Sequence, residues 1–552
     1  MPLDRRRLLQ AAASGAALAG LLPAWAQHAH EAGAGAAELS GTDIALTVSR
    51  IALSVEGRQA HAVAINGTVP GPLIRLRQGQ TVRLSVTNRL DEETSIHWHG
   101  LLVPFQMDGV PGVSFPGIPP GETFVYEFPV RQSGTYWYHS HSGLQEQEGH
   151  YGPIVIEPAG AEPAPAAREH VVVLSDFSPL HPHTIFRRLK QEAGFFNFQR
   201  QTLAGLLAGE DLKLAERAHW ARMRMDPTDI SDVTGAAYTY LINGRGPADN
   251  WTGLFTPGQR LKLRIINAAA QTIFNVRIPG LALTVAAADG QYVRPVTVDE
   301  FQIGNAETYD VILEPREDRA FTLVAEAVDR SGLARATLAP RPGMTAAVPP
   351  LRPRPLATMK DMGMDHAGHG GHAMAGSGAP PVPLGPGVQM VTAMPMDRTG
   401  EPGQGLEDVG HRVLAYRDLI ALEANPDSRA PGRALEIRLT GNMERFIWGF
   451  DGKTFSDGPA PYSFRAGERV RITLVNDTMM THPIHLHGHF FELVHGPVGH
   501  LPRKHTVNVL PAGKVTFDVT AEDGDWAFHC HMLYHMHAGM FQVFTVRRGA
   551  GA

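Results

Sequence analysis

The sequence predicts an all-β protein built from three β-sandwich domains. One strand-like motif occurs three times along the 552 residues, which indicates three copies of one folding unit. The 58 glycines and 42 prolines supply the many turns that short strands require. A hydrophobic fraction of 43% with 19% charged residues is typical of a globular protein, and the length suffices for three or four domains.

The repeated motif is a turn glycine, then alternating apolar and polar residues, then a closing asparagine. Its copies span Gly79–Asn88, Gly258–Asn267 and Gly467–Asn476. Such alternation is expected of a strand with one buried face. We therefore place sandwich domains at residues 40–160, 168–340 and 406–549.

The segments between these motifs differ in character. From about residue 184 to 232 turn residues are scarce and short amphipathic runs occur, so we expect a helical insertion in the second domain. Residues 341–405 are rich in Pro, Gly, Met and His and show no periodicity. This composition predicts a long, mobile Met/His-rich linker before the third domain.

The N-terminus predicts export. Residues 1–26 have the pattern of a signal peptide: three arginines at 5–7 resemble a twin-arginine signal, and Ala24-Trp25-Ala26 fits a cleavage site. The apolar run between them is too short to span a bilayer. We therefore expect a periplasmic protein without a membrane span.

The net charge and the cysteine content bear on two possibilities, nucleic-acid binding and disulfide bonds. The formal net charge is −6, and no basic stripe with interleaved aromatic residues occurs, which argues against nucleic acid as a partner. Cys530 is the only cysteine, so no intrachain disulfide can form. A thiol in an oxidising compartment then needs another purpose.

Histidines follow the repeated motif in register. Nine and eleven residues past the closing asparagine, the first motif is followed by His97 and His99 and the third by His485 and His487. The corresponding positions of the middle domain hold Val276 and Ile278. The first and third domains are therefore the candidates for metal binding, and the middle domain is expected to be a spacer without metal.

A second register adds two more pairs. His139 and His141 lie five and seven residues past Gly134, as His529 and His531 do past Gly524. A lone pair of this kind arises by chance among 27 histidines. Four pairs in register suit a cluster of several copper ions better than one zinc ion, because a structural zinc site closes with four ligands.

Cys530 lies between two of these histidines. On a strand, His529 and His531 share one face while Cys530 points to the other, so this stretch can serve two sites. Cys530 with His535 and an axial Met540 would give the trigonal ligand set of a blue copper site. The alternative is a buried thiol among incidental histidines.

These motifs resemble those of the multicopper oxidases over nearly the whole chain. The motifs are H-W-H-G at 97–100, H-S-H-S-G at 139–143, H-P-I-H-L-H-G at 482–488 and H-C-H-M-L-Y-H-M-H-A-G-M at 529–540. The stretches at 104–117, 145–149 and 151–157 further resemble the periplasmic copper-resistance branch, the copper-resistance protein A type. The resemblance implies three cupredoxin-like Greek-key domains.

The resemblance also implies four copper ions and their ligands. Type 1 copper would be held by His482, Cys530, His535 and Met540, and type 2 copper by His97 and His485. The type 3 pair would be held by His99, His139 and His531 on one ion and by His141, His487 and His529 on the other. Asp108 lies where family members often keep an acid that assists proton delivery, although Asp108-Gly109 also reads as a simple turn.

The implied function is a monomeric oxidase that couples one-electron oxidation of a donor to reduction of O2 to water. Cuprous ion is the expected donor, in a copper-resistance role. The alternatives are a laccase-like oxidase of phenols or aromatic amines, and a copper-sequestering protein without turnover. Thioether and imidazole ligands suited to substrate copper occur in the linker, at Met359, Met362, Met364, His366, His369, His372 and Met374.

Overall fold

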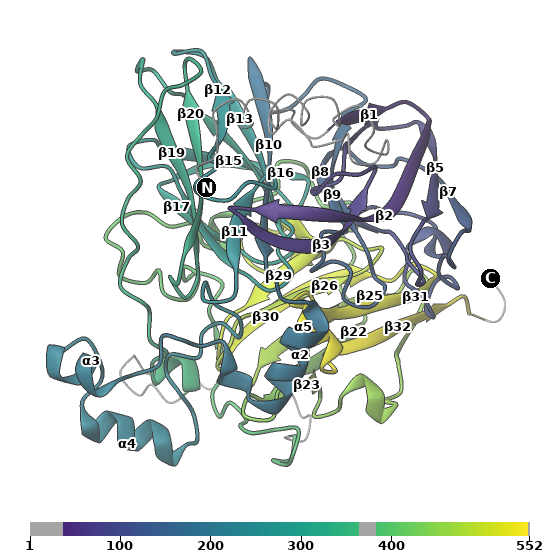
Figure 1. The fold of residues 1–552 in the computed structure, drawn as a ribbon. Helices are drawn as coiled ribbons and strands as arrows, with labels where there is room; N and C mark the ends of the chain where they lie inside the picture. Colours follow the sequence, from purple (N-terminus) through teal and green to yellow (C-terminus); the bar gives the residue numbers. More distant parts are fainter. Residues whose placement is uncertain (1–36, 364–381, 550–552) are drawn as a thin grey trace, which may run out of the picture.

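The computed structural model describes residues 37–363 and 382–549, which form six β-sheets arranged as three sandwiches (Figure 1). The expected all-β fold is confirmed. The expected signal peptide, residues 1–26, lies outside the described residues.

The first domain contains a five-stranded and a four-stranded sheet. The first holds β1 (Glu38–Ser40), β4 (Leu73–Arg77), β9 (Tyr151–Glu157), β8 (Gly134–His139) and β6 (His97–His99), in this order. The second holds β3 (Arg58–Ile65), β2 (Asp43–Val55), β5 (Thr81–Asn88) and β7 (Thr123–Pro129).

The second domain contains a six-stranded and a five-stranded sheet. The first holds β11 (Thr239–Ile242), β10 (Arg168–Phe177), β13 (Leu261–Asn267), β18 (Thr308–Leu313), β15 (Leu283–Ala288) and β16 (Gln291–Val298). The second holds β12 (Trp251–Leu254), β20 (Leu333–Ala339), β19 (Phe321–Ala327), β14 (Phe274–Arg277) and β17 (Glu300–Ile303).

The third domain contains a seven-stranded and a five-stranded sheet. The first holds β23 (Ile447–Phe450), β22 (Arg433–Asn442), β25 (Arg469–Asn476), β30 (Gly513–Thr520), β27 (Phe491–Leu493) and β28 (Arg503–Lys504), with β21 (Met396–Asp397) paired to β30. The second holds β24 (Tyr462–Arg465), β32 (Phe541–Arg547), β31 (Gly524–Cys530), β26 (His482–Leu486) and β29 (Thr506–Val509).

The three repeated motifs form equivalent strands. β5, β13 and β25 each run parallel to an earlier strand, namely β2, β10 and β22. Each also runs antiparallel to a later strand, namely β7, β18 and β30. The repeat found in the sequence is therefore a repeat of topology.

The closing asparagine of each motif is fully buried and fastens the loop that follows its strand. The Nδ2 group of Asn476 donates to the carbonyls of Met480 and Val509, at 2.7 and 2.9 Å, and its Oδ1 accepts from the amide of Thr478 at 2.9 Å. Asn88 and Asn267 make the same kinds of bond. A buried amide needs all these partners, which explains why asparagine ends every copy.

The helices among the described residues lie mostly in the second domain. They are α2 (Pro182–Gln191), α3 (Leu203–Ala208), α4 (Leu214–Arg222) and, in the third domain, α5 (Leu533–His537). The first three fall where the sequence predicted a helical insertion, and α3 and α4 project from the sheets (Figure 1).

The described parts of the connection before the third domain are more ordered than the mobile linker that its composition predicted. Arg398 is 2% exposed as a side chain and pairs with Asp361 at 2.8 Å and Glu401 at 2.8 Å. Met362 is buried in the main hydrophobic cluster, and Met359 packs against that cluster. Composition alone did not reveal these ion pairs and apolar contacts, because neither is periodic.

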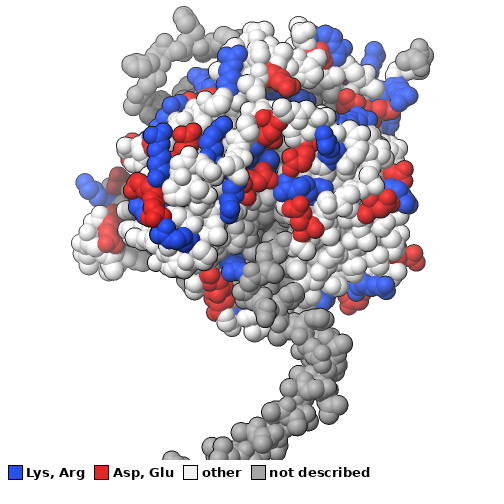
Figure 2. All heavy atoms as spheres, turned by 90° about the horizontal axis from the view of Figure 1, so that it is seen from above, with Lys and Arg blue, Asp and Glu red and all other residues white. Residues whose placement is uncertain are grey.

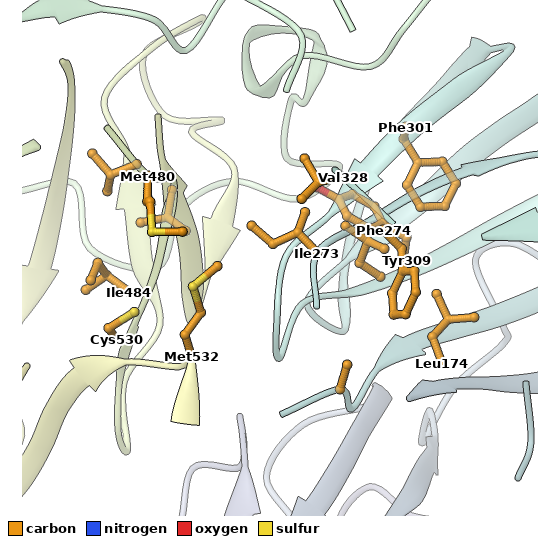
Figure 3. Packing of buried hydrophobic residues seen from close by; sticks show 14 of the residues in the cluster. Leu174, Ile273, Phe274, Phe301, Tyr309, Val328, Met480, Ile484, Cys530 and Met532 are labelled. Carbon is orange, nitrogen blue, oxygen red and sulfur yellow. The ribbon is translucent and has the colours of Figure 1, made fainter. Parts of the chain in front are cut away.

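One hydrophobic cluster continues from the second domain into the third. Figure 3 shows Cys530, Ile484 and Met480 at one side of it and Ile273 and Phe274 at the other. The first domain has a core of its own. Continuous packing fixes the second domain rigidly against the sheets that carry Cys530.

Candidate metal centres

Two equivalent pairs of strands carry the histidines. In β6 and β8, His97 lies opposite His139. In β26 and β31, His485 lies opposite His529. Since alternate residues of a strand face the same side, each pair presents its histidines to a common face.

The eight histidines of the four H-x-H pairs converge where the first and third domains meet. The ring centroids of His97 and His487 are 3.9 Å apart, and those of His99 and His485 are also 3.9 Å apart. Further ring contacts, at 5.1 and 5.0 Å, join the pairs His141–His529 and His139–His531. Each of these contacts crosses from one domain to the other.

Main-chain carbonyls fix the orientation of several rings. The Nδ1–H of His97 donates to the carbonyl of Asp108, and that of His485 to the carbonyl of His505, both at 2.7 Å. The Nε2 atoms of both rings are buried and have no hydrogen-bond partner. A neutral imidazole fixed in this tautomer offers its Nε2 lone pair to a metal.

Three Nε2 atoms approach one another more closely than lone pairs tolerate. His487 Nε2 is 2.9 Å and His141 Nε2 is 3.4 Å from His529 Nε2. The Nδ1 groups of His487 and His529 already donate, to Asp108 Oδ2 at 2.8 Å and to the carbonyl of Cys530 at 3.0 Å. With this tautomer their Nε2 atoms are both acceptors, and a cation bound between them would relieve the repulsion.

The remaining rings also leave nitrogens free. His99 Nε2 lies 3.3 Å from Thr506 Oγ1, which leaves its buried Nδ1 without a partner. His139 directs Nδ1 to Glu146 Oε2 at 2.9 Å and leaves Nε2 without a partner. Neither ring nitrogen of His531 has a partner. Such orphaned buried atoms fit a metal cluster.

The protonation state suits metal binding. Burial, and then the neighbouring histidines, lower the pKa values of His99, His139, His141, His485, His487 and His531 well below the usual range. Burial lowers the pKa of His529 to about 4. Neutral imidazole is the form that binds metals, so no proton has to be removed near neutral pH.

Asp108 joins ligands of two domains. Its carbonyl accepts from His97 and its Oδ2 from His487, while Oδ1 is buried without a hydrogen-bond partner, 3.4 Å from His97 Nδ1. Gly109 has φ +83° and lies so close to Ile96 that a Cβ would be 1.8 Å from its carbonyl oxygen. The turn expected at Asp108-Gly109 is therefore present and brings the carboxylate against the cluster.

The second site lies behind β31. Cys530 Sγ is 3.6 Å from His482 Nδ1 and 3.8 Å from His535 Nδ1, and these two nitrogens are 3.2 Å apart. Met540 is fully buried, and its carbonyl accepts from the amide of Cys530 at 3.1 Å. This soft and borderline donor set fits copper.

Outer contacts hold both imidazoles of this second site. His482 Nε2 lies 2.8 Å from Thr478 Oγ1, and His535 Nε2 donates to Asp232 Oδ2 at 2.7 Å. The Trp448 ring stacks on His535 with centroids 4.0 Å apart. Burial raises the pKa of the Cys530 thiol, so a metal bound there must displace a proton.

Sequence reasoning missed several residues at these sites. Asp232 and Glu146 touch predicted ligands, and His505 lies close to His99 and His485. Asp232 and His505 belong to no repeat or recognisable motif, and Glu146 lies in the 145–149 stretch without any sign in the sequence of its contact with His139. Only the folded chain brings them to the ligands.

The structure describes only some of the linker residues that are expected to bind substrate copper. Met362 is buried and Met359 half-buried against the core, so neither is free to capture ions at the surface. The other expected residues, Met364, His366, His369, His372 and Met374, lie outside the described residues.

The surface charges and the helices of the described residues bear on nucleic-acid and membrane binding. Figure 2 shows acidic and basic side chains intermingled on the visible face, without a basic stripe. In the part of the chain that the structure describes, no helix has the length and apolar character needed to cross a bilayer.

Comparisons with known proteins agree over the whole chain. Three family models described as multicopper oxidase match residues 47–161, 213–348 and 428–550. The copper resistance protein A of Escherichia coli is 48% identical over 93% of both chains. A copper resistance protein A homolog of Pseudomonas syringae pv. tomato is 46% identical, over 98% of this chain and 99% of its own.

Solved structures share the fold. The multicopper oxidase Fet3p, described as functioning in iron import, has a TM-score of 0.65 at 20% identity, over 92% of this chain and 90% of its own. A laccase from Botrytis aclada also has a TM-score of 0.65, at 22% identity, over 95% and 89%. The chain contains two clusters of free nitrogen and sulfur atoms, and it shares its fold and sequence with these proteins. It therefore belongs to the multicopper oxidase family, whose members are copper-dependent oxidoreductases that use O2 as electron acceptor.

Proposed function

We propose that this chain is a periplasmic copper-resistance oxidase that oxidises cuprous ion and reduces O2 to water. The relatives named for copper resistance support this role. The N-terminal sequence supports export by the twin-arginine route, and a monomer is the expected state. The observation that carries the choice of donor is a methionine- and acid-lined pocket beside the Cys530 site.

We further propose four copper ions. The ligands of type 1 copper are His482, Cys530, His535 and Met540, and those of type 2 copper are His97 and His485. The type 3 ions take His99, His139 and His531, and His141, His487 and His529. The orphaned nitrogens described above support metal binding by these rings, and the close approach of the ligand atoms of His141, His487 and His529 supports one of the two type 3 sets.

Bound copper would supply the one-electron chemistry, and β31 would link the two sites. Cys530 belongs to one site, while His529 and His531, bonded to it through the main chain, belong to the other. An electron that enters at the thiolate therefore has a short covalent route to the cluster.

The donor pocket lies between the helical insertion and the third domain. It has a volume of about 470 Å³, and three methionines, four carboxylates and two arginines line it. They are Met225, Met443, Met479, Asp226, Asp229, Glu192, Glu444, Arg200 and Arg224. The two arginines pair with Glu192 and Glu444, which leaves Asp226 and Asp229 as the carboxylates not engaged by these arginines. Thioethers are soft ligands that favour cuprous ion, and carboxylates attract any cation. A phenol would find no aromatic side chain among the pocket's residues.

The pocket is connected to the Cys530 site. Asp229 interacts electrostatically with Asp232, whose carboxylate accepts the hydrogen bond from His535. Phe446 also contacts the ring of His535, with centroids 5.8 Å apart. A cuprous ion in the pocket would thus be close to an exit path for its electron.

O2 would reach the cluster from another side. Among the eight clustered histidines only His141 is not fully buried, and it lines a separate pocket of about 480 Å³ with Pro111, Ser142 and Gly143. Separate entrances would keep the donor away from the site where O2 is reduced. Asp108 would deliver protons there, as its contact with His487 supports.

Oxygen consumption with limiting cuprous ion, compared with a simple phenol, tests the proposal. A Met225→Leu, Met443→Leu double variant should raise the KM for cuprous ion about tenfold, the equivalent of about 1.4 kcal/mol of lost binding. Its phenol turnover and blue colour should persist. A matched control, Met394→Leu with Met396→Leu, alters two exposed methionines and should change nothing.

Other outcomes would favour the alternatives. Turnover of phenols with no response to cuprous ion would indicate a laccase-like oxidase, and copper binding without O2 consumption would indicate sequestration. Capture of cuprous ion by the linker residues Met364, His366, His369, His372 and Met374 stays a separate prediction.

A further inference from the structure

The second domain inserts a tight turn at the junction of the three domains. The turn joins β15 to β16 through Asp289 and Gly290, both with positive φ, at +49° and +70°. A Cβ on Gly134 of β8 would lie 2.3 Å from Gly290 O, and a Cβ on Gly290 would lie 2.3 Å from the Tyr136 ring. The turn is therefore packed directly against the strand that ends in His139.

The Asp289 carboxylate reaches into the third domain. Its Oδ2 accepts from the main-chain amides of His505 at 3.2 Å and Thr506 at 3.1 Å, and pairs with Lys504 Nζ at 3.0 Å. Its Oδ1 accepts from the amide of Thr308 in its own domain at 3.1 Å. Asp289 and Lys504 are fully buried, so these bonds are sheltered from water.

The segment that Asp289 holds contacts cluster histidines of both outer domains. The carbonyl of His505 accepts from His485 Nδ1 at 2.7 Å. Thr506 Oγ1 lies 3.2 Å from the same His485 atom and 3.3 Å from His99 Nε2. The free nitrogens of these two rings, His485 Nε2 and His99 Nδ1, are the orphaned ones.

We propose that Asp289 is a positioning residue for the trinuclear copper centre, through which the second domain sets the orientation of His485 and His99. The inference rests on the proposed copper assignment. The second domain is then more than a spacer. It contributes no proposed metal ligand, but it fixes the main chain of residues 504–506, which orients His99 of the first domain and His485 of the third. Contacts of this kind behind a ligand typically change metal affinity 10- to 100-fold.

Asp310 offers a matched control. It is as deeply buried a carboxylate of the second domain, and its Oδ1 accepts from Thr135 Oγ1 of β8 at 2.6 Å. Its other oxygen pairs with Arg264 at 2.8 Å. Asp310→Asn therefore loses the same charge at the same domain junction, but the hydrogen bonds and the ion pair of Asp310 go to Thr135 and Arg264 and not to residues 504–506.

The test loads the full-length Asp289→Asn and Asp310→Asn variants and the parent with copper and titrates each with a chelator. We expect Asp289→Asn to release type 2 copper about 10- to 100-fold more readily than the parent and to shift its type 2 electron paramagnetic resonance signal. Its blue absorption should stay, and Asp310→Asn should behave as the parent.

Thr506→Val is the second variant. It tests whether residues 504–506 position the cluster histidines if Asp289→Asn fails to fold. It removes only the hydroxyl near His485 and His99 and should shift the same signal, whereas Thr506→Ser should restore it. Unaltered type 2 retention and signal in Asp289→Asn or in Thr506→Val, or equal losses in Asp289→Asn and Asp310→Asn, would overturn the inference. A parent chain without type 2 copper would instead refute the copper assignment, and the inference with it.

Discussion

The hydrogen bond between His535 and Asp232 should tune the reduction potential of the blue centre. The bond is 2.7 Å long, and Gln271 Nε2 donates to the same carboxylate oxygen at 2.6 Å. Asp232→Asn keeps the size of the side chain and an accepting oxygen but removes its negative charge. The variant therefore isolates the effect of charge on the ligand.

The size of the effect follows from the type of bond that changes. A hydrogen bond to a charged group contributes about 1.5–3 kcal/mol and a neutral one about 1 kcal/mol, so the change is worth about 0.5–2 kcal/mol, and about 1.4 kcal/mol is used as a value within this range. A negative charge stabilises cupric copper more than cuprous copper, so its loss should raise the midpoint potential. The same energy is a tenfold change in equilibrium constant, or about 59 mV for one electron.

The effect should depend on pH. Burial raises the pKa of Asp232 to about 7. Above this pH the parent carries the charge that the variant lacks, and the full difference in potential is expected. Below it a proton neutralises the parent carboxylate, and the two potentials should converge.

A redox titration of the blue absorption band measures the shift. Asp229→Asn, measured above pH 8 where both carboxylates are charged, is the control, because Asp229 belongs to the same loop but makes no bond to His535. A lower or unchanged potential in Asp232→Asn would refute the reasoning. Equal shifts in both variants would mean that a general field, rather than this bond, sets the potential.

Further predictions concern single side chains. Cys530→Ser should lose the blue colour and all turnover yet stay folded; a blue variant would exclude Cys530 as the thiolate ligand. His219→Ala, on an exposed part of α4, should keep colour and turnover, and a loss of cluster copper would contradict a copper-free second domain. Asp108→Asn should slow O2 reduction at least tenfold while the blue band persists, and unchanged steady-state O2 consumption would remove Asp108 from proton delivery. Burial, with the charges of Asp232 and Asp226, raises the pKa of Asp229 to about 8, so the KM for cuprous ion should fall as pH rises through 8 and Asp229→Asn should abolish this slope.

Much of the fold could be predicted because the sequence patterns that indicate its strands lie within short stretches of the chain. The alternation before Asn88, Asn267 and Asn476 marks a strand with one buried face, and the asparagine itself is needed to fasten the next loop. The histidine pairs keep a fixed distance from those strands. Their convergence could thus be inferred from register, without knowledge of how the domains pack.

The contacts between domains could not be predicted in this way. Asp289 is separated from His505 by 216 residues, and nothing in either local sequence indicates the other. The packing of Met362 against the core was likewise hidden by a composition typical of linkers. Such contacts depend on the shapes of folded surfaces rather than on any period in the chain.

The even division of the cluster between the two ends of the chain has a consequence for biosynthesis. Four of the eight imidazoles belong to the first domain, and two of the other four come from β31 and the residue after it, close to the C-terminus. A chain interrupted before residue 529 has neither Cys530 nor two of the four cluster histidines of the third domain. The complete set of proposed copper ligands is therefore present only once synthesis has passed residue 540.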